Sequence, residues 1–184
     1  MRKILRLFVT QYITDEYPIG KKCDIDITRI PVIETFEGFD EIVICGGEPL
    51  LYHRNIERLC QSLWMLSDIT EHPVKIIVET SKPDYYLFDS LRKWVDGFIL
   101  TPRTKTDMVY FKKLNNELLH NRYFFKDISL KLNILPSVRD FYPENLNMWK
   151  IEEFNNDGIA HFSDDFRRLR VLWDSDFSWY NARR

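Results

Sequence analysis

Short apolar runs alternate with amphipathic stretches along most of this chain. Five of the runs have the length and apolar content of strands: Ile4–Thr10, Glu41–Cys45, Val74–Val78, Gly97–Leu100 and Ile128–Leu135. Three of the stretches between them repeat apolar residues at three-to-four spacing, which predicts helices over Asn55–Ser67, Tyr85–Val95 and Asp107–Leu119. Because strands separated by such helices form βα units, the pattern predicts an α/β fold with a parallel sheet.

The pattern is weaker in the first long connection and near the C-terminus. Tyr12–Phe39 is broken by proline and glycine and shows no convincing period. After Pro136 the sequence predicts three further elements: a helix over Glu144–Phe154 that begins after Pro143, a turn at Asn155–Gly158, and a strand or helix over Phe166–Trp173. We expect one domain over residues 1–184, with 137–184 as a C-terminal extension.

The ends of the predicted strands indicate where a ligand would bind. In a parallel sheet the carboxyl ends of the strands meet at one edge, where α/β proteins bind their ligands. Thr10, Gly46, Thr80 and Thr101 therefore share one predicted rim. Gly47 follows Gly46, and two adjacent glycines leave backbone groups uncovered by side chains.

Three segments at this rim occur in an order that is typical of one family. GGEPLL begins at Gly46, Glu79-Thr80-Ser81 ends the third predicted strand, and Thr101-Pro102-Arg103 follows the fourth. This order resembles the radical SAM superfamily, and in particular its small members of the 7-carboxy-7-deazaguanine synthase type, over roughly Ile4–Pro136. The resemblance implies a small partial (β/α) barrel that binds S-adenosylmethionine (SAM).

The resemblance assigns the GGEP turn to the methionine part of SAM. Gly46, Gly47 and Glu48, with Pro49 completing the motif, would surround its amino group. Carbonyl oxygens and a carboxylate suit this role, because they accept charge-assisted hydrogen bonds from an ammonium group.

The next two segments of the rim complete the implied site. Thr80 and Ser81 would lie near the ribose or carboxylate of SAM, although Lys82-Pro83 replaces the Asn-Gly of the family. Thr101 and Arg103 would contact the substrate, and Arg103 stands where the family has a lysine. A cation at that position could hold an anionic substrate. A solvated turn is an equally good interpretation of Arg103.

The cysteines depart from the family. Its members bind a [4Fe–4S] cluster through three cysteines in the loop after the first strand. Here the corresponding segment, Thr10–Thr28, contains only Cys23, while Cys45 lies in a predicted strand and Cys60 on the apolar face of a predicted helix. One thiolate cannot hold a cluster that takes three or four cysteine ligands. We therefore expect no cluster and no radical chemistry. Catalytic residues cannot be assigned from the sequence, and no metal-binding residue is predicted.

The leading hypothesis is a radical-SAM-like protein that binds SAM or a nucleoside without catalysis and acts as a binding or regulatory protein. A second hypothesis is an active SAM-dependent enzyme related to 7-deazaguanine synthesis. A third is a single-strand nucleic-acid or protein interaction module that uses the aromatic and arginine-rich tail, residues 166–184. The same tail could instead form a homodimer or bind a protein partner.

Composition and charge narrow the partners that we expect. The net charge of −2 gives no general attraction to nucleic acid or to an anionic membrane. No segment reaches the length of a transmembrane helix, and three widely spaced cysteines do not form a secreted disulfide framework, so a cytoplasmic protein is expected. Two alanines and many Ile, Lys and Asn residues are typical of an AT-rich genome, for instance a viral one.

Overall fold

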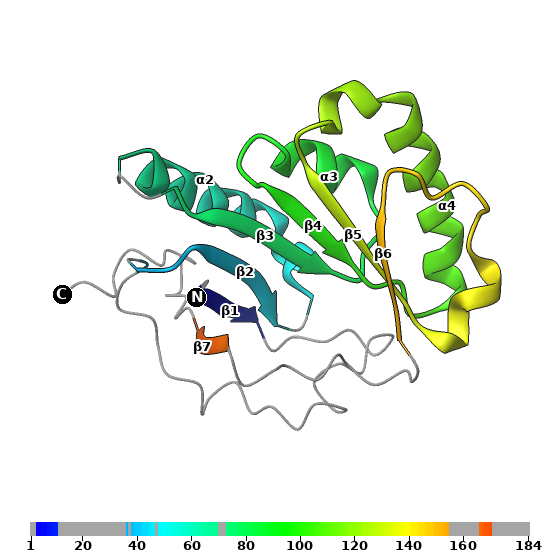
Figure 1. The fold of residues 1–184 in the computed structure, drawn as a ribbon, viewed down its shortest axis with the longest axis horizontal. Helices are drawn as coiled ribbons and strands as arrows, with labels where there is room; N and C mark the ends of the chain where they lie inside the picture. Colours follow the sequence, from blue (N-terminus) through cyan, green and yellow to red (C-terminus); the bar gives the residue numbers. More distant parts are fainter. Residues whose placement is uncertain are drawn as a thin grey trace.

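A parallel β-sheet forms the centre of the molecule. The computed structural model describes residues 3–10, 36, 38–46, 48–69, 73–154 and 166–170. Within these residues the strands are β1 (Ile4–Thr10), β2 (Glu41–Gly46), β3 (Lys75–Thr80), β4 (Gly97–Leu100), β5 (Ser129–Ile134), β6 (Lys150–Glu153) and β7 (Phe166–Arg170). They form one seven-stranded sheet in the order β6-β5-β4-β3-β2-β1-β7, and every neighbouring pair is parallel (Figure 1).

The helices lie on one face of this sheet. They are α2 (His53–Ile69), α3 (Tyr85–Leu91) and α4 (Lys105–His120), with short 3-10 turns η2 (Pro49–Tyr52), η3 (Arg122–Phe125) and η4 (Pro136–Phe141). Strands β1 to β6 follow one another in sequence order, and right-handed crossovers between such strands bring the described helices to the same face. Figure 1 shows α2, α3 and α4 side by side on that face.

The main core fills the space between the sheet and the helices. Alternate strand residues such as Leu5, Ile44 and Leu132 point into it, as the two-residue period of a strand requires. The helices contribute their apolar faces, including Phe111 and Leu118 of α4, which are fully buried. The βα units and the α/β parallel sheet predicted from the sequence are confirmed.

Cys60 lies on the buried face of α2, as predicted. Its side chain is fully buried in the main core, where burial raises the pKa of the thiol because the apolar surroundings disfavour the thiolate. Leu63 and Trp64 both belong to the three-to-four repeat of apolar residues that predicts this helix. Leu63 is buried in the core, whereas Trp64 is 44 % exposed and packs edge-on against Trp94.

The predicted helix over Glu144–Phe154 is wrong. Residues 142–149 form no regular helix, and Lys150–Glu153 is the edge strand β6, which pairs with β5. The indole nitrogen of Trp149 donates a hydrogen bond of 2.9 Å to Asn115 Oδ1, which fixes the chain as it enters β6. A buried tertiary contact therefore overrides the local helix signal of Pro143.

Two other elements differ from their predicted form. Helix α3 ends at Leu91, four residues before the predicted end at Val95, and a turn follows in which Trp94 N donates to Leu91 O. Phe166–Arg170, for which a strand and a helix were both open, is strand β7. It pairs with β1 at the edge opposite β6.

Several predictions lie outside the described residues. They concern Gly47, most of the first connection with Cys23, the turn at Asn155–Gly158, and the tail beyond Arg170. In the described part of the chain, no helix is both long enough and apolar enough to cross a membrane.

Replacing Thr104 by alanine should remove the N-terminal cap of α4. Thr104 Oγ1 accepts a hydrogen bond from Asp107 N, and the Asp107 carboxylate accepts one from Thr104 N, so the two residues form a capping box. Loss of the threonine oxygen should lower the free energy of unfolding by about 1 kcal/mol, measured by urea denaturation. The exposed Thr106, replaced by alanine as a control, should leave stability unchanged; equal losses in both variants would contradict the cap.

Candidate functional site

The described strand ends meet at one edge of the sheet, which we call the strand-end rim and define by Gly46, Glu48, Thr80, Ser81, Thr101 and Asn133. Parallel pairing places the ends of β2, β3, β4 and β5 next to one another. A hydrogen bond of 2.9 Å from Thr101 N to Thr80 O continues the β3–β4 ladder into the rim. The predicted meeting of the segments after β2, β3 and β4 at one edge is thus observed.

Glu48 is the most constrained residue of the rim. Its side chain is fully buried although it carries a carboxyl group. Oε1 accepts hydrogen bonds from Leu50 N at 3.1 Å and from Thr80 Oγ1 at 2.5 Å. Oε2 accepts two from Ser81, from N at 2.8 Å and from Oγ at 2.6 Å. The carboxylate therefore joins the turn after β2 to the end of β3.

These four donors use the full capacity of the carboxylate to accept hydrogen bonds. A carboxylate has about four lone-pair positions for hydrogen bonds, and Leu50, Thr80 and Ser81 fill them. The predicted contact between Glu48 and the amino group of SAM stays a prediction. The geometry gives Glu48 a second role, which is to hold Thr80 and Ser81 against the turn.

The turn itself has the backbone that the glycine motif predicts. Gly46 has a φ of 114°, a value that residues with a side chain rarely adopt. Pro49 is buried and begins η2, where its missing N–H and fixed φ suit the first helical position. Glu48 caps this short turn through Leu50 N. A glycine at position 46 is therefore needed for the chain to leave β2 in this direction.

Thr101 lies beside a residue that sequence reasoning missed. Both Thr101 and Asn133 are 7 % exposed, and Asn133 Nδ2 donates a hydrogen bond of 2.9 Å to Thr101 Oγ1. The other side-chain polar atom, Asn133 Oδ1, is buried and has no hydrogen-bond partner. The sequence carried no signal for this site, because Asn133 follows Ser129 and Lys131 at the polar positions of an alternating strand.

Arg103 follows Thr101 and is half-buried. Its backbone N–H donates a hydrogen bond of 2.9 Å to Asp107 Oδ2, so the residue leads directly into the capped start of α4. The predicted contact of Arg103 with a substrate is untested by this arrangement. Arg103 thus lies two residues after Thr101 of the rim.

The face of the sheet opposite the described helices carries a partly buried ion pair. Arg6 of β1 contacts the Glu79 carboxylate of β3, and Cys45 of β2 lies next to the guanidinium. Burial by itself lowers the pKa of Arg6, but Cys45 and Glu79 raise it, and the net shift is upward. Sequence reasoning missed this pair, although a single arginine within an apolar strand was a signal for it.

The described cysteines lie on opposite sides of the sheet. Cys45 packs with Phe8 and Val43 on the face opposite the described helices, whereas Cys60 belongs to the core under α2. Both are buried and free of disulfides. Within the described residues no group of three or more His, Cys, Asp or Glu side chains could hold a metal ion.

The rim thus combines Gly46 with its positive φ, hydroxyl groups that are hydrogen-bonded to Glu48 and Asn133, and a buried amide whose oxygen has no partner. Such groups bind and orient a polar ligand through hydrogen bonds. They include no described pair of nucleophile and base. Comparisons of the chain with protein-family models, with curated proteins and with solved structures found no match.

Proposed function

We propose that this chain is a radical-SAM-like binding protein that holds SAM or a related nucleoside at the strand-end rim without carrying out radical chemistry. In this proposal the sheet corresponds to a partial (β/α) barrel. Three features support this correspondence: β1 to β6 follow one another in sequence order, the described helices lie on one face, and the motif segments lie at the strand ends.

The observation that carries the proposal is the buried Glu48 carboxylate. A fully buried acidic side chain is costly unless its oxygens are satisfied, and here four donors from two segments satisfy them. The result is a fixed turn beside Gly46. Backbone carbonyls of this turn would receive the ammonium group of SAM, and Glu48 would act as a positioning residue.

Asn133 supplies the rim with an unused acceptor. Its buried Oδ1 could accept a hydrogen bond from a hydroxyl or amino group of the nucleoside, while its Nδ2 stays bound to Thr101. Such a donor would remove the penalty of an unpaired buried oxygen. We therefore include Asn133 in the proposed ligand site.

The absence of radical chemistry in the proposal rests on the positions of the cysteines. The chain has three cysteines, and two of them, Cys45 and Cys60, face opposite sides of the sheet. Three thiolates from this chain could not meet at one cluster without rearranging the sheet. The residues present therefore do not fit a cluster bound by three cysteines.

Titration calorimetry with SAM tests the proposed pocket. We expect binding heat with the wild-type chain and a roughly five- to hundredfold weaker affinity for Asn133→Ala, because a ligand donor would lose its buried acceptor. Asn116→Ala changes an exposed asparagine on α4 and should bind SAM normally. Absence of heat with SAM and with adenosine would reject the pocket.

Anaerobic iron–sulfur reconstitution tests the proposal that the chain carries out no radical chemistry. We expect no visible absorption from a bound cluster and no cleavage of SAM. A cluster that forms and cleaves SAM would overturn the non-catalytic function and favour an enzyme with other ligands.

A further inference from the structure

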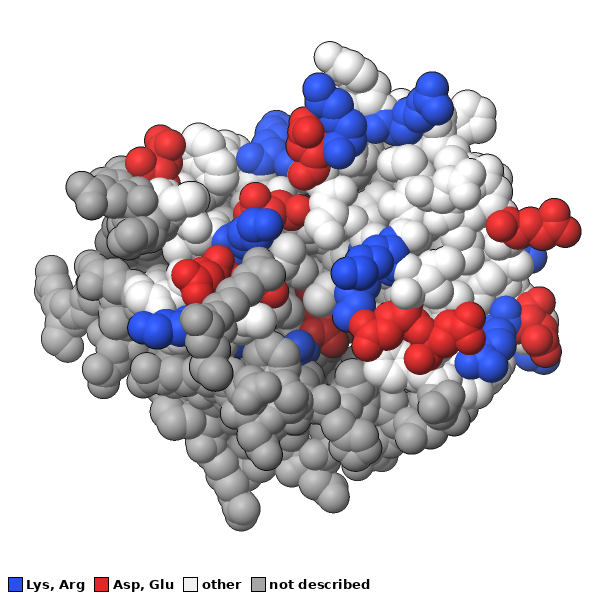
Figure 2. Space-filling model, in the orientation of Figure 1, with Lys and Arg blue, Asp and Glu red and all other residues white. Residues whose placement is uncertain are grey.

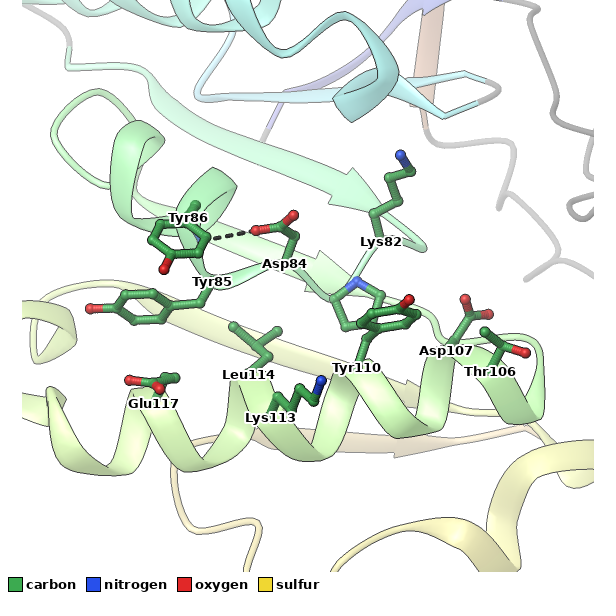
Figure 3. Close-up of a pocket in the computed structure, with 11 residues that line it drawn as sticks. Lys82, Asp84, Tyr85, Tyr86, Thr106, Asp107, Tyr110, Lys113, Leu114 and Glu117 are labelled. Atoms are coloured by element: carbon green, nitrogen blue, oxygen red, sulfur yellow. Dashed lines mark hydrogen bonds between the residues drawn. The ribbon is translucent and has the colours of Figure 1, made fainter.

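A second concave site lies within the helix layer, apart from the strand-end rim. A pocket of about 630 Å³ opens between the start of α3 and one face of α4. This volume is within the range of about 300–1,000 Å³ that is typical of ligand sites. Figure 3 shows Tyr85 and Tyr86 on the α3 side, and Tyr110, Lys113 and Leu114 on the α4 side.

Two tyrosine rings are presented openly at this pocket. Tyr86 is 83 % exposed and Tyr110 is 53 % exposed, while Leu114 between them is buried and forms an apolar floor. An exposed ring next to an apolar floor offers a flat surface on which another planar ring can stack. Aromatic stacking of this kind is how proteins bind unpaired nucleic-acid bases.

The basic and acidic side chains around the pocket differ in their hydrogen bonding. Lys82 and Lys113 line the pocket, neither amine forms an ion pair with another described residue, and Lys113 Nζ lies 5.7 Å from the centre of the Tyr110 ring. Asp84 accepts hydrogen bonds from the N–H groups of Tyr86 and Leu87 at the start of α3. Asp107 accepts them from the N–H groups of Arg103 and Thr104, just before α4. The positive ends of those two helices offset these carboxylates.

The opposite end of the pocket suits the edge of a base. Glu117 and the hydroxyl of Tyr85 point to this end in Figure 3. The carboxylate can accept a hydrogen bond from an exocyclic amino group, and the hydroxyl can donate one to a ring nitrogen or carbonyl. The pocket therefore offers stacking surface, anion contacts and base-edge contacts together.

Further ring and cation pairs continue from the pocket toward η3. Tyr85 contacts Phe125, and the Arg92 guanidinium lies 5.1 Å from the centre of the Phe124 ring. Beyond them Lys126 Nζ lies 5.1 Å from the centre of the Tyr123 ring, which is 71 % exposed. A single nucleotide would not reach these groups, but a strand of several nucleotides would.

The pocket lining itself has two lysines and three acidic residues, but the segment that forms the groove and its surroundings is positively charged. Residues 82–126 contain nine of the 26 lysines and arginines and five of the 28 acidic residues, a net charge of +4, although the whole chain has −2. Figure 2 shows Lys and Arg side chains gathered along the upper edge of the molecule, on the helix side of the sheet. The net charge of the whole chain, which gives no general attraction to nucleic acid, hides this local excess.

From these observations we propose that the groove between α3 and α4 binds single-stranded nucleic acid. Bases stack on Tyr86 and Tyr110, with phosphates at Lys82 and Lys113. The strand continues past Arg92 to the η3 rings. This site uses none of the residues of the proposed SAM pocket, although Lys82 follows Ser81 and its backbone N–H donates a hydrogen bond of 3.0 Å to Thr80 Oγ1.

Fluorescence anisotropy with a labelled oligothymidylate of about 12 nucleotides tests the groove. We expect binding that weakens as salt rises from about 50 to 200 mM, because phosphate contacts release counterions. Tyr86→Ala and Tyr110→Ala should each weaken binding about tenfold. Lys113→Glu should weaken it as well and reduce the slope against salt by about one.

Control variants outside the groove test whether the loss of binding is specific to the groove residues. Met65→Ala removes an exposed apolar side chain from α2, and Lys150→Glu reverses an exposed charge at the start of β6; both should bind as the wild type does. No binding, or equal affinity for a duplex or for a free mononucleotide, would overturn the proposal. So would binding that survives Tyr86→Ala but is lost when residues 177–184 are removed.

Discussion

Replacing Glu48 by glutamine is expected to lower the free energy of unfolding by about 2–4 kcal/mol. Glutamine has the same shape but exchanges one acceptor oxygen for a donating NH₂ group. In one orientation that group faces Ser81 N–H, and in the other it faces Leu50 N–H. The hydroxyls of Thr80 and Ser81 can rotate to accept, but a backbone N–H cannot. One buried donor therefore loses its acceptor in either orientation.

Thermal and urea denaturation measure this loss, which corresponds to a fall of roughly 4–16 °C in the melting temperature of a chain of this size. Ser81→Ala removes only one of the four donors and should cost less than Glu48→Gln. Glu144→Gln makes the same chemical change at an exposed position and should be neutral to within about 0.5 kcal/mol. A Glu48→Gln variant as stable as the wild type would show that the buried charge costs as much as its hydrogen bonds contribute.

Replacing Gly97 by alanine is expected to cost roughly 2–3 kcal/mol, because β4 and β5 approach too closely there for a side chain. A Cβ atom at Gly97 would lie 2.5 Å from Ser129 O and 2.9 Å from Ser129 Cβ. The carbonyl of Ser129 is part of the sheet backbone and cannot rotate away. Since Ser129 N also donates to Asp96 O, relief of the clash would distort the start of the β4–β5 pairing.

Gly38 provides the matched comparison for Gly97. It has a φ of 81°, but a Cβ atom there would meet nothing within 4 Å. Gly38→Ala should therefore cost only the conformational penalty of about 1–2 kcal/mol. Urea denaturation of both variants separates steric clash from backbone strain, and a smaller loss for Gly97→Ala than for Gly38→Ala would contradict the clash.

Much of the fold could be predicted because its signal is local. Strands β1 and β4 begin and end at the predicted residues. Their apolar side chains, such as Leu5 and Phe98, are buried in the core and therefore leave an apolar run in the sequence. Strand β6 could not be predicted in the same way. All four residues from Lys150 to Glu153 are exposed, so this edge strand has no buried face to leave a period in the sequence.

The site was predictable in its position and less so in its contacts. The glycine turn and the strand ends follow from local motifs, and the rim gathers as βα units require. Leu50 is a local partner of Glu48, but Thr80 and Ser81 are 32 and 33 residues away, and no local pattern specifies that they share its carboxylate. The pairing of Arg6 with Glu79 and of Asn133 with Thr101 likewise depends on which strands are neighbours. Such contacts become visible only when the sheet order is known.

The order of the sheet has a consequence for the chain as it is synthesised. Strands β1 to β5 can pair as soon as they emerge, and they then expose unpaired backbone groups at both edges, on β1 and on β5. The two strands that cover those edges, β7 and β6, are made last. Their sequences, FRRLR and KIEE, are rich in charge, which discourages pairing with strands of other molecules. The two charged strands thus cover the edges of β1 and β5, at which strands of other molecules could otherwise pair and aggregate.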